Sequence, residues 1–181
     1  VIELNSETDF VARNEQFQKL VGKLATLALD NTGDVAELLK VTDPASGRTV
    51  EDELTQQIAT IGENMQLRRA GRVSVENGAV AAYVHNATAD GMGKIGVLIA
   101  LESTGDQAKL QELGKQIAMH VAATRPESVN KEELDQELVE RERSVLSDQA
   151  RASGKPEEII EKMVEGRIRK FYEEVVLLEQ V

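Results

Sequence analysis

The order of polar and apolar residues predicts strands and helices along the first 124 residues. Near alternation at the amino terminus is typical of a half-buried strand, and the next long segment repeats apolar residues every three or four positions, as one face of a helix does. Turns such as NG and DGMG separate later runs rich in Val, Ile and Leu. The predicted elements are a strand at 1–5, helices at 14–30, 35–41 and 49–61, strands at 65–75, 79–85 and 94–101, and a helix at 107–124.

Two segments in which a strand leads into a long helix resemble each other. A shift of 93 positions lays Ile2 over Ile95 and residues 17–29 over residues 110–122, with glutamine, leucine and alanine at matching places. This agreement predicts a duplication, and an α+β fold of two similar halves, each a small antiparallel sheet with helices packed on one face. The predicted halves are residues 1–76 and 77–129.

Capping residues mark two of the predicted helix starts. Thr49, with Asp52 three residues later, resembles an N-cap pair at the start of the helix predicted at 49–61. Gly62 is expected to end that helix. Asn130 and Glu133 form a second pair with the same spacing, and they predict the start of another helix.

The residues from 130 to 178 predict an antiparallel helical hairpin that projects from the rest of the protein. Neither glycine nor proline occurs in the first arm before the turn at 154–156, and the second arm is predicted from 156 to 178. Apolar residues in the second arm are three or four positions apart, which gives a seam for packing against another helix. The seam residues are Ile160, Val164, Ile168, Phe171, Val175 and Leu178.

Composition and charge limit the classes of partner. The chain has 181 residues, 41% of them hydrophobic, which is enough for one good core or two small ones. A formal net charge of −11 repels phosphate and anionic lipid, so we expect a protein partner, no direct nucleic-acid partner and no membrane. The absence of cysteine agrees with a reducing, cytoplasmic location. The first residues resemble the middle of a strand, which suggests an excised fragment.

Candidate catalytic chemistry is sparse. The two histidines, His85 and His120, lack a carboxylate at metal-ligand spacing, and there is no phosphate-binding loop or nucleophile elbow. We therefore expect no catalytic residue, no metal and no cofactor, and a protein that is not an enzyme. A hydrolase that uses Glu7, Asp9 and Glu63 is one alternative, but it needs a metal cluster that these spacings do not provide.

The segment SETDFVAR at residues 6–13 allows two interpretations. Thr8 or Asp9 could cap the following helix while Phe10 packs on its first turns, or the ring could be offered to another molecule. His120 leaves a similar choice, because it is either a partly exposed ring near a helix carboxyl terminus or a residue of a binding surface.

The run ELNSETDFVAR resembles the pattern of the elongation factor Ts family at each of its positions. The resemblance continues in the order of that family and spans essentially the whole chain. The matching segments are ELNSETDFVAR (3–13), IGENMQLRR (61–69), KIGVLIA (94–100), QIAMHVAATRPE (116–127) and SGKPEEIIEKMVEGRIRKF (153–171).

In that family the protein is a guanine-nucleotide exchange factor for the GTPase EF-Tu and has no catalytic chemistry of its own. The resemblance implies that Phe10 enters a hydrophobic pocket beside the nucleotide site of EF-Tu, and that Asp9 and its loop disturb the magnesium and phosphate region. It also implies that the hairpin reaches another part of EF-Tu. The further positions that match partner contacts are Thr8, Val11, Ile95, Gly96 and His120.

Relative to the family pattern, this chain is a core region. The amino-terminal helical module, a strand before Val1 and the last strand of the second half are missing from it. An alternative function is a structural protein that uses the helical seam to form a homodimer or a scaffold, with Phe10 internal.

Overall fold

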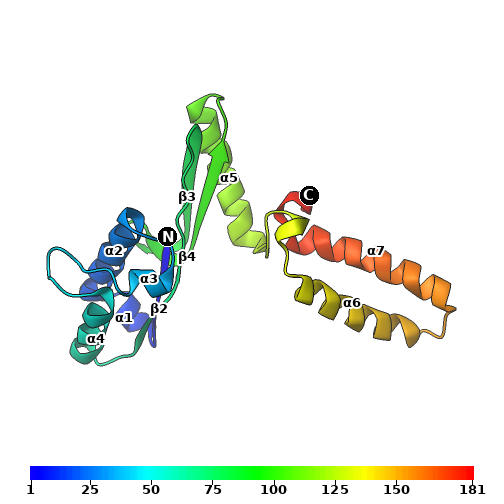
Figure 1. The fold of residues 1–181 in the computed structure, drawn as a ribbon, viewed down its shortest axis with the longest axis horizontal. Helices are drawn as coiled ribbons and strands as arrows, with labels where there is room; N and C mark the ends of the chain where they lie inside the picture. The colour runs from blue at the N-terminus through cyan, green and yellow to red at the C-terminus, as the bar shows by residue number, and fades with distance from the viewer. The chain divides into compact units, whose positions relative to one another are not determined.

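The computed structural model describes residues 1–181, which divide into two units, Val1–Ala122 and Ala123–Val181. The first unit contains two small antiparallel sheets with their helices, and the second contains the helical hairpin (Figure 1). This arrangement confirms the predicted α+β class. None of the helices combines the length and the apolar character that crossing a membrane requires.

The first sheet pairs strands from opposite ends of the first half of the chain. Strand β1 (Ile2–Ser6) runs antiparallel to β2 (Met65–Ala70), with an irregularity in register after Glu3. Helices α2 (Glu15–Asp30), α3 (Val35–Leu38) and α4 (Val50–Ile61) contribute to the core below this sheet. The buried residues of this core are Val11, Phe17, Leu20, Leu24, Leu27, Ala28, Leu38, Val50, Leu54, Met65 and Leu67.

Helix α2 forms for local reasons that the sequence contains. The Asn14 side chain accepts hydrogen bonds from the backbone N–H groups of Gln16 and Phe17 and caps the helix. The apolar stripe predicted from the spacing of three and four is buried. Helix α4 is equally local in origin, because Thr49 caps it and Gly62, at φ +83°, ends it in the left-handed conformation.

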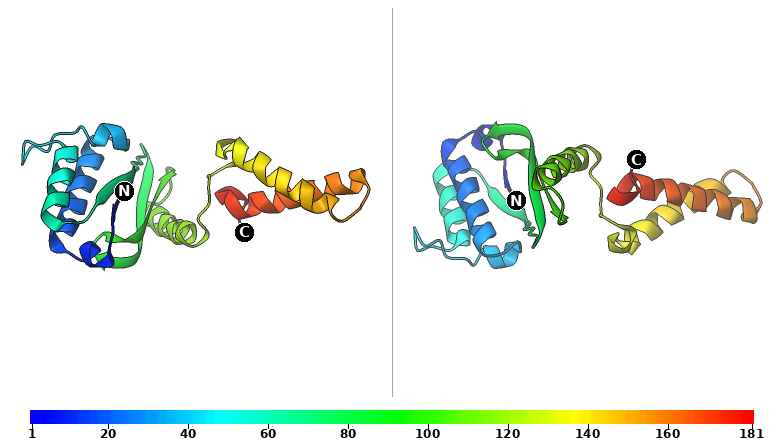
Figure 2. Two further views of the ribbon diagram at one scale, coloured as in Figure 1. Left: turned by 90° about the horizontal axis from the view of Figure 1, so that it is seen from below. Right: turned by 90° about the horizontal axis from the view of Figure 1, so that it is seen from above.

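The second sheet is a long two-stranded ribbon. Strand β3 (Gly78–Ala89) pairs antiparallel with β4 (Met92–Glu102), and helix α5 (Gln107–Thr124) packs on it. Figure 2 shows α5 on one side of the strands and α2 with α4 on the other. The buried residues of α5 are all small, namely Gly114, Ala118 and Ala122. A Cβ atom at Gly114 would lie 2.8 Å from the Cβ atom of Ala81, so the helix approaches the ribbon closely.

The predicted strand–helix repeat corresponds to real elements. A shift of 93 positions carries β1 into β4 and α2 into α5. The two copies pack differently, because α2 buries large apolar side chains whereas α5 buries only glycine and alanine.

Several boundaries in the first unit differ from the sequence prediction: α3 ends at Leu38 and not at 41, and β4 is longer than predicted at both ends. The strand predicted at 65–75 ends at Ala70. The next strand in the sequence, β3, is longer than predicted at both ends. The ladder of β2 with β1 ends at Ala70, which pairs with Ile2.

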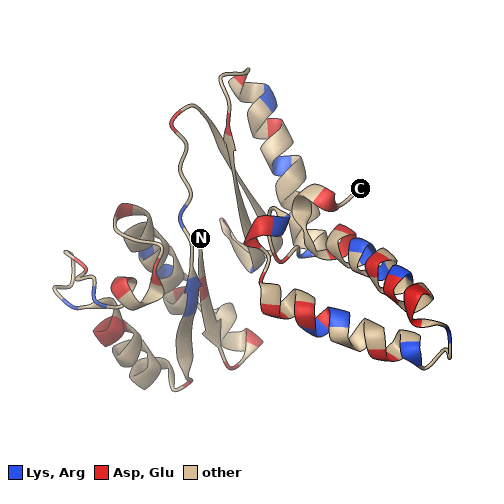
Figure 3. Ribbon diagram, turned by 45° about the vertical axis from the view of Figure 1, so that its right-hand side comes forward, with Lys and Arg blue, Asp and Glu red and all other residues tan.

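The second unit is a hairpin of α6 (Gln136–Arg151) and α7 (Glu157–Val175). Leu146 and Ala150 pack against Ile160, Val164 and Ile168, which confirms the centre of the predicted seam. Acidic and basic residues are interspersed along both helices (Figure 3). Leu178, which was predicted to extend the seam, is instead 71% exposed, because the helix ends before it.

The base of the hairpin corrects both predicted helix ends. Asn130 caps only the short 3-10 helix η1 (Lys131–Glu133), and the chain then extends at Leu134 before α6 begins. At its carboxyl end α7 stops at Val175, because the next residue, Val176, is extended and buried. Val176 forms a β-bridge with Ser128. The 3-10 helix η2 (Leu177–Glu179) follows.

Candidate functional site

The segment between β1 and α2 contains a single helical turn, α1 (Asp9–Ala12). Thr8 is its N-cap, and the Thr8 Oγ1 atom accepts a hydrogen bond from the backbone N–H of Val11 at 3.5 Å. Because Asn14 caps α2 separately, Thr8 does not cap the long helix. The predicted loop is therefore a small helix with its own cap.

The Phe10 ring lies outside the core of its own protein. Its side chain is 85% exposed, although the other phenylalanine of this unit, Phe17, is 5% exposed. The interpretation that Phe10 packs on the first turns of the helix is therefore wrong. Burial of an exposed ring against a partner lowers the free energy of the system, because it removes apolar surface from water.

Val11 explains why the ring points outward. Its side chain is 7% exposed and belongs to the core under the first sheet. Neighbouring residues in a helix point about 100° apart, so burial of Val11 directs Phe10 away from the core. The Val11 side chain therefore anchors α1, and it has little surface to offer a partner.

Glu63 holds the amino-terminal end of α1. Its carboxylate accepts two hydrogen bonds from Thr8, one from the hydroxyl to Oε1 at 2.6 Å and one from the backbone N–H to Oε2 at 3.1 Å. Glu63 lies in the short connection that follows α4 and precedes β2. A segment 55 residues away in sequence therefore fixes the start of α1.

Lys94 forms an ion pair with Asp9, the first residue of α1. Its Nζ atom lies 3.2 Å from Oδ1 of Asp9, and the two side chains are 60% and 72% exposed. Lys94 belongs to β4, so this ion pair ties α1 to the second sheet. An ion pair this exposed contributes little stability and can open at low cost.

The other predicted contact residues lie farther along the second sheet and its helix. Ile95 and Gly96 follow Lys94 in β4, where they pair with His85 and Val84. Ile95 is half-buried and Gly96 is exposed. His120 is half-buried on α5, on the other side of the strands from α2 (Figure 2).

Comparison with known proteins identifies the family. The family model described as elongation factor Ts matches residues 7–181, which include α1, strand β2, the second sheet and the hairpin. The chain belongs to the elongation factor Ts family. Proteins named elongation factor Ts are 63% identical to it in Rhodospirillum centenum, 62% in Parvibaculum lavamentivorans and 59% in Rhizobium meliloti, each over 180 residues.

This chain covers only part of its elongation factor Ts relatives. Each of the three alignments includes 99% of this chain but 59%, 58% and 59% of the respective relative. The chain therefore spans about three fifths of the length of these proteins.

The supporting roles of Glu63 and Lys94 in this member of the elongation factor Ts family are not evident from the sequence. There, Glu63 is a candidate only for an acidic site with Glu7 and Asp9. The structure instead engages Glu63 with Thr8 and Asp9 with Lys94, and it forms no group of three or more His, Asp or Glu side chains that could hold a metal ion. The available signal was the tight turn at Gly62, which places Glu63 at the entrance to β2.

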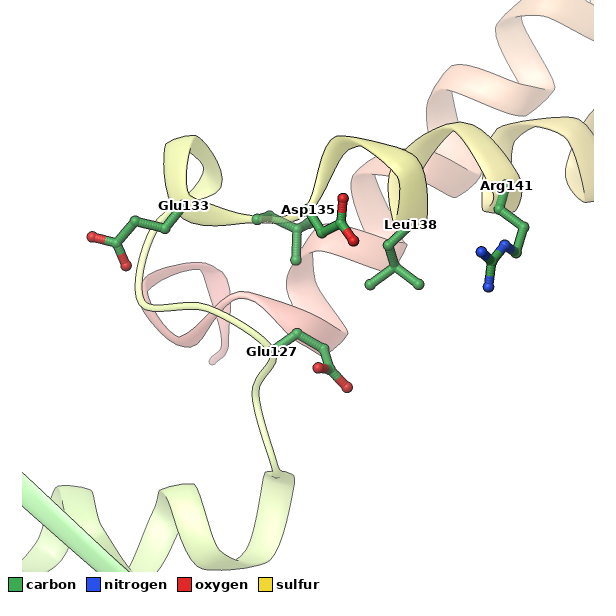
Figure 4. Close-up of a pocket in the computed structure, with 6 residues that line it drawn as sticks. Glu127, Glu133, Asp135, Leu138 and Arg141 are labelled. Carbon is green, nitrogen blue, oxygen red and sulfur yellow. The ribbon is translucent and has the colours of Figure 1, made fainter. Parts of the chain in front are cut away.

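A hollow with a volume of about 340 Å³ lies at the base of the hairpin (Figure 4). Its acidic groups already have local structural roles. Glu133 accepts a hydrogen bond from Asn130, and Asp135 caps α6. The lining residues are Glu127, Glu133, Leu134, Asp135, Leu138 and Arg141.

Proposed function

We propose that this chain is a translation elongation factor that accelerates GDP release from EF-Tu, with Phe10 as the intruding group. The single observation that carries the proposal is the 85% exposed ring on a turn held by buried Val11 and by Glu63. Family membership supplies the identity of the partner. The chain acts by binding and not by catalysing a covalent step.

Exchange by this route is a coupling between two ligands of EF-Tu. The factor and GDP must bind together less favourably than they bind separately, and the penalty is reciprocal. Burial of a phenyl ring contributes about 1.5–3 kcal/mol. Since each 1.4 kcal/mol changes affinity about tenfold, the ring supplies roughly ten- to a hundredfold loosening of GDP, and wider contacts supply the rest.

Asp9 adds a charge next to the ring. In the proposed complex its carboxylate approaches the magnesium and phosphate region of EF-Tu, where like-charge repulsion weakens nucleotide binding. The Lys94 ion pair keeps the Asp9 carboxylate beside β4 in the free protein, and its exposure allows it to open on binding.

The remaining predicted contacts extend the interface. We assign Ile95 and Gly96 of β4, His120 of α5 and the α6–α7 hairpin to surfaces that bind EF-Tu away from the nucleotide. The net charge of −11 fits a protein partner in the cytoplasm better than nucleic acid or an anionic membrane.

The hairpin packing weighs against a dimer or scaffold as the main function. Ile160, Val164 and Ile168 are each at most 4% exposed because they pack on α6. The seam that would join two copies is therefore already occupied within one chain.

The test is release of a fluorescent GDP analogue from EF-Tu in excess unlabelled GDP. The chain is expected to speed release, and Phe10→Ala should reduce the acceleration by about tenfold or more without lowering the melting temperature. Leu29→Ala in α2 is a matched control, because it removes another largely exposed apolar side chain from the same unit. No acceleration by the unchanged chain, or equal acceleration by Phe10→Ala, would overturn the proposal.

A further inference from the structure

We propose that Glu63 is a positioning residue for Phe10, which sets the orientation of α1 before EF-Tu is met. This inference rests on the proposed function, because it assigns Glu63 a role in that same exchange site. Glu63 itself does not need to touch EF-Tu. It acts through Thr8, the residue that caps the turn carrying the ring.

The sheet register brings Glu63 to Thr8. In the antiparallel ladder Ser6 pairs with Met65, so the residues two positions beyond the ladder on each strand, Thr8 and Glu63, face each other. Both oxygens of the carboxylate are used there, at 2.6 and 3.1 Å from the two Thr8 donors. The contact therefore continues the pairing of β1 and β2 with a side chain in place of the backbone.

The Thr8 hydroxyl links Glu63 to the helical turn. Its one proton is donated to Glu63, which leaves its lone pairs to accept the backbone N–H of Val11. Glu63 thereby fixes the direction in which this hydroxyl can act as a cap.

A four-residue helix needs such external support. One turn is far below the length at which an isolated helix is stable in water. Val11 holds α1 to the core from one side, and Glu63 holds its N-cap residue, Thr8, from another. Without the second attachment the turn can unwind or rotate about Val11, and Phe10 would lose its fixed direction.

Glu63→Gln is the informative substitution. An amide keeps one acceptor oxygen, but its NH₂ group cannot accept a hydrogen bond, so one Thr8 donor loses its partner. GDP release from EF-Tu at limiting concentrations of the chain should slow by about three- to tenfold. Thr8→Val should give a similar loss, whereas Thr8→Ser retains the hydroxyl and should lose less activity than Thr8→Val. Glu7→Gln is the matched control, since it removes the same charge from an exposed residue next to Thr8.

A double substitution separates positioning from general stability. If Glu63 acts through the ring, Glu63→Gln should have no further effect on release when Phe10 is already alanine. A further three- to tenfold loss in the Phe10→Ala background would overturn the inference, because the effect would then be independent of the ring.

A measurement without EF-Tu keeps the inference testable if the proposed function fails. Fluorine NMR of the chain labelled with fluorophenylalanine gives one signal for each of the three phenylalanines. Glu63→Gln should shift or broaden the Phe10 signal and leave that of buried Phe17 unchanged. If the unchanged chain does not speed GDP release, only the proposed function fails. An unaltered Phe10 signal in Glu63→Gln would overturn the positioning role.

Discussion

Asp9 and Lys94 connect the exposed turn α1 to strand β4 through an ion pair of 3.2 Å between Oδ1 and Nζ. The two residues are 85 positions apart in sequence, and both side chains remain largely in solvent. The pair therefore holds the Asp9 charge in place with little contribution to folding stability.

Lys94→Met is expected to change the free energy of unfolding by less than about 1 kcal/mol, because exposed ion pairs contribute at most about that amount. Urea unfolding of the variant and of the unchanged chain measures this difference. In the GDP-release assay Asp9→Asn should lose more activity than Lys94→Met, since the proposed function assigns only Asp9 to the nucleotide site. A loss of stability of several kcal/mol in Lys94→Met would contradict this assignment.

A second prediction concerns the ion cluster around Lys23 in the first unit. The Lys23 ammonium lies 2.6 Å from Asp43 and 3.3 Å from Glu53, and both carboxylates are buried. Lys23→Met leaves two buried carboxylates with much less compensation. The melting temperature of this unit should fall by about 10 °C. Lys19→Met is the control, because Lys19 forms only an exposed pair with Glu15.

The same cluster predicts loss of stability in acid. A hydrogen bond from Lys23, with others from the backbone of Ala45, lowers the pKa of Asp43 well below its usual range. A hydrogen bond from Ser46, followed by the contact with Lys23, lowers the pKa of Glu53. Carboxylates with lowered pKa values in the folded state stabilise it above the unfolded pKa values, near 4, and this stabilisation declines as the pH falls below them.

Urea unfolding between pH 7 and pH 3 should therefore show declining stability below about pH 4.5. The decline should be shallower in Lys23→Met, because the lysine is a cause of both lowered pKa values. An equal slope in the two proteins would show that other groups control the acid response.

A third prediction compares two glycines that lie inside long helices. A Cβ atom at Gly114 of α5 would lie 2.8 Å from the Cβ atom of Ala81, whereas nothing lies within 4 Å of a Cβ atom at Gly166 of α7. Gly114→Ala should destabilise the first unit by about 1–3 kcal/mol through overpacking. Gly166→Ala should stabilise the hairpin by about 0.5–1 kcal/mol, because alanine is the better helix former.

Thermal unfolding of the two variants checks both signs in one experiment. Destabilisation by Gly166→Ala would contradict the finding that a Cβ atom at this position of α7 has open space around it. An unchanged melting temperature in Gly114→Ala would mean that α5 can move away from the ribbon without loss.

Helix ends that depend on neighbouring side chains can be predicted from the sequence. Thr49 and Asp52 bond to each other at 2.8 and 3.1 Å, as the spacing indicates, and Gly62 ends α4 where expected. The buried stripe of α2 also follows from its spacing alone. These features require only residues within a few positions of one another.

Ends that depend on distant packing are not predictable in this way. The segment after Asn130 contains no helix breaker, yet the chain extends at Leu134 because that side chain is buried with Val139 and Val176. Val176 is far away in the sequence, and the local pattern does not contain this contact. The pairing of β2 also depends on a distant segment, because its partner β1 lies near the amino terminus.

The candidate site combines both cases. The sequence permits either a packed or an exposed Phe10, and the choice is made by the burial of Val11 in a core that forms from several helices. The contact of Thr8 with Glu63 requires the pairing of β1 with β2, so no local pattern contains it. Family resemblance indicated the ring, but the residues that hold it became visible only in three dimensions.

The continuation of the β1–β2 register through Thr8 and Glu63 makes the number of residues before the ring matter as much as their identity. One residue inserted between Ser6 and Thr8 would take the cap out of reach of its carboxylate, or else displace the strand by one place and turn its inward side chains outward. Protein engineers who lengthen this connection should therefore expect a misdirected ring even when each original amino acid is kept.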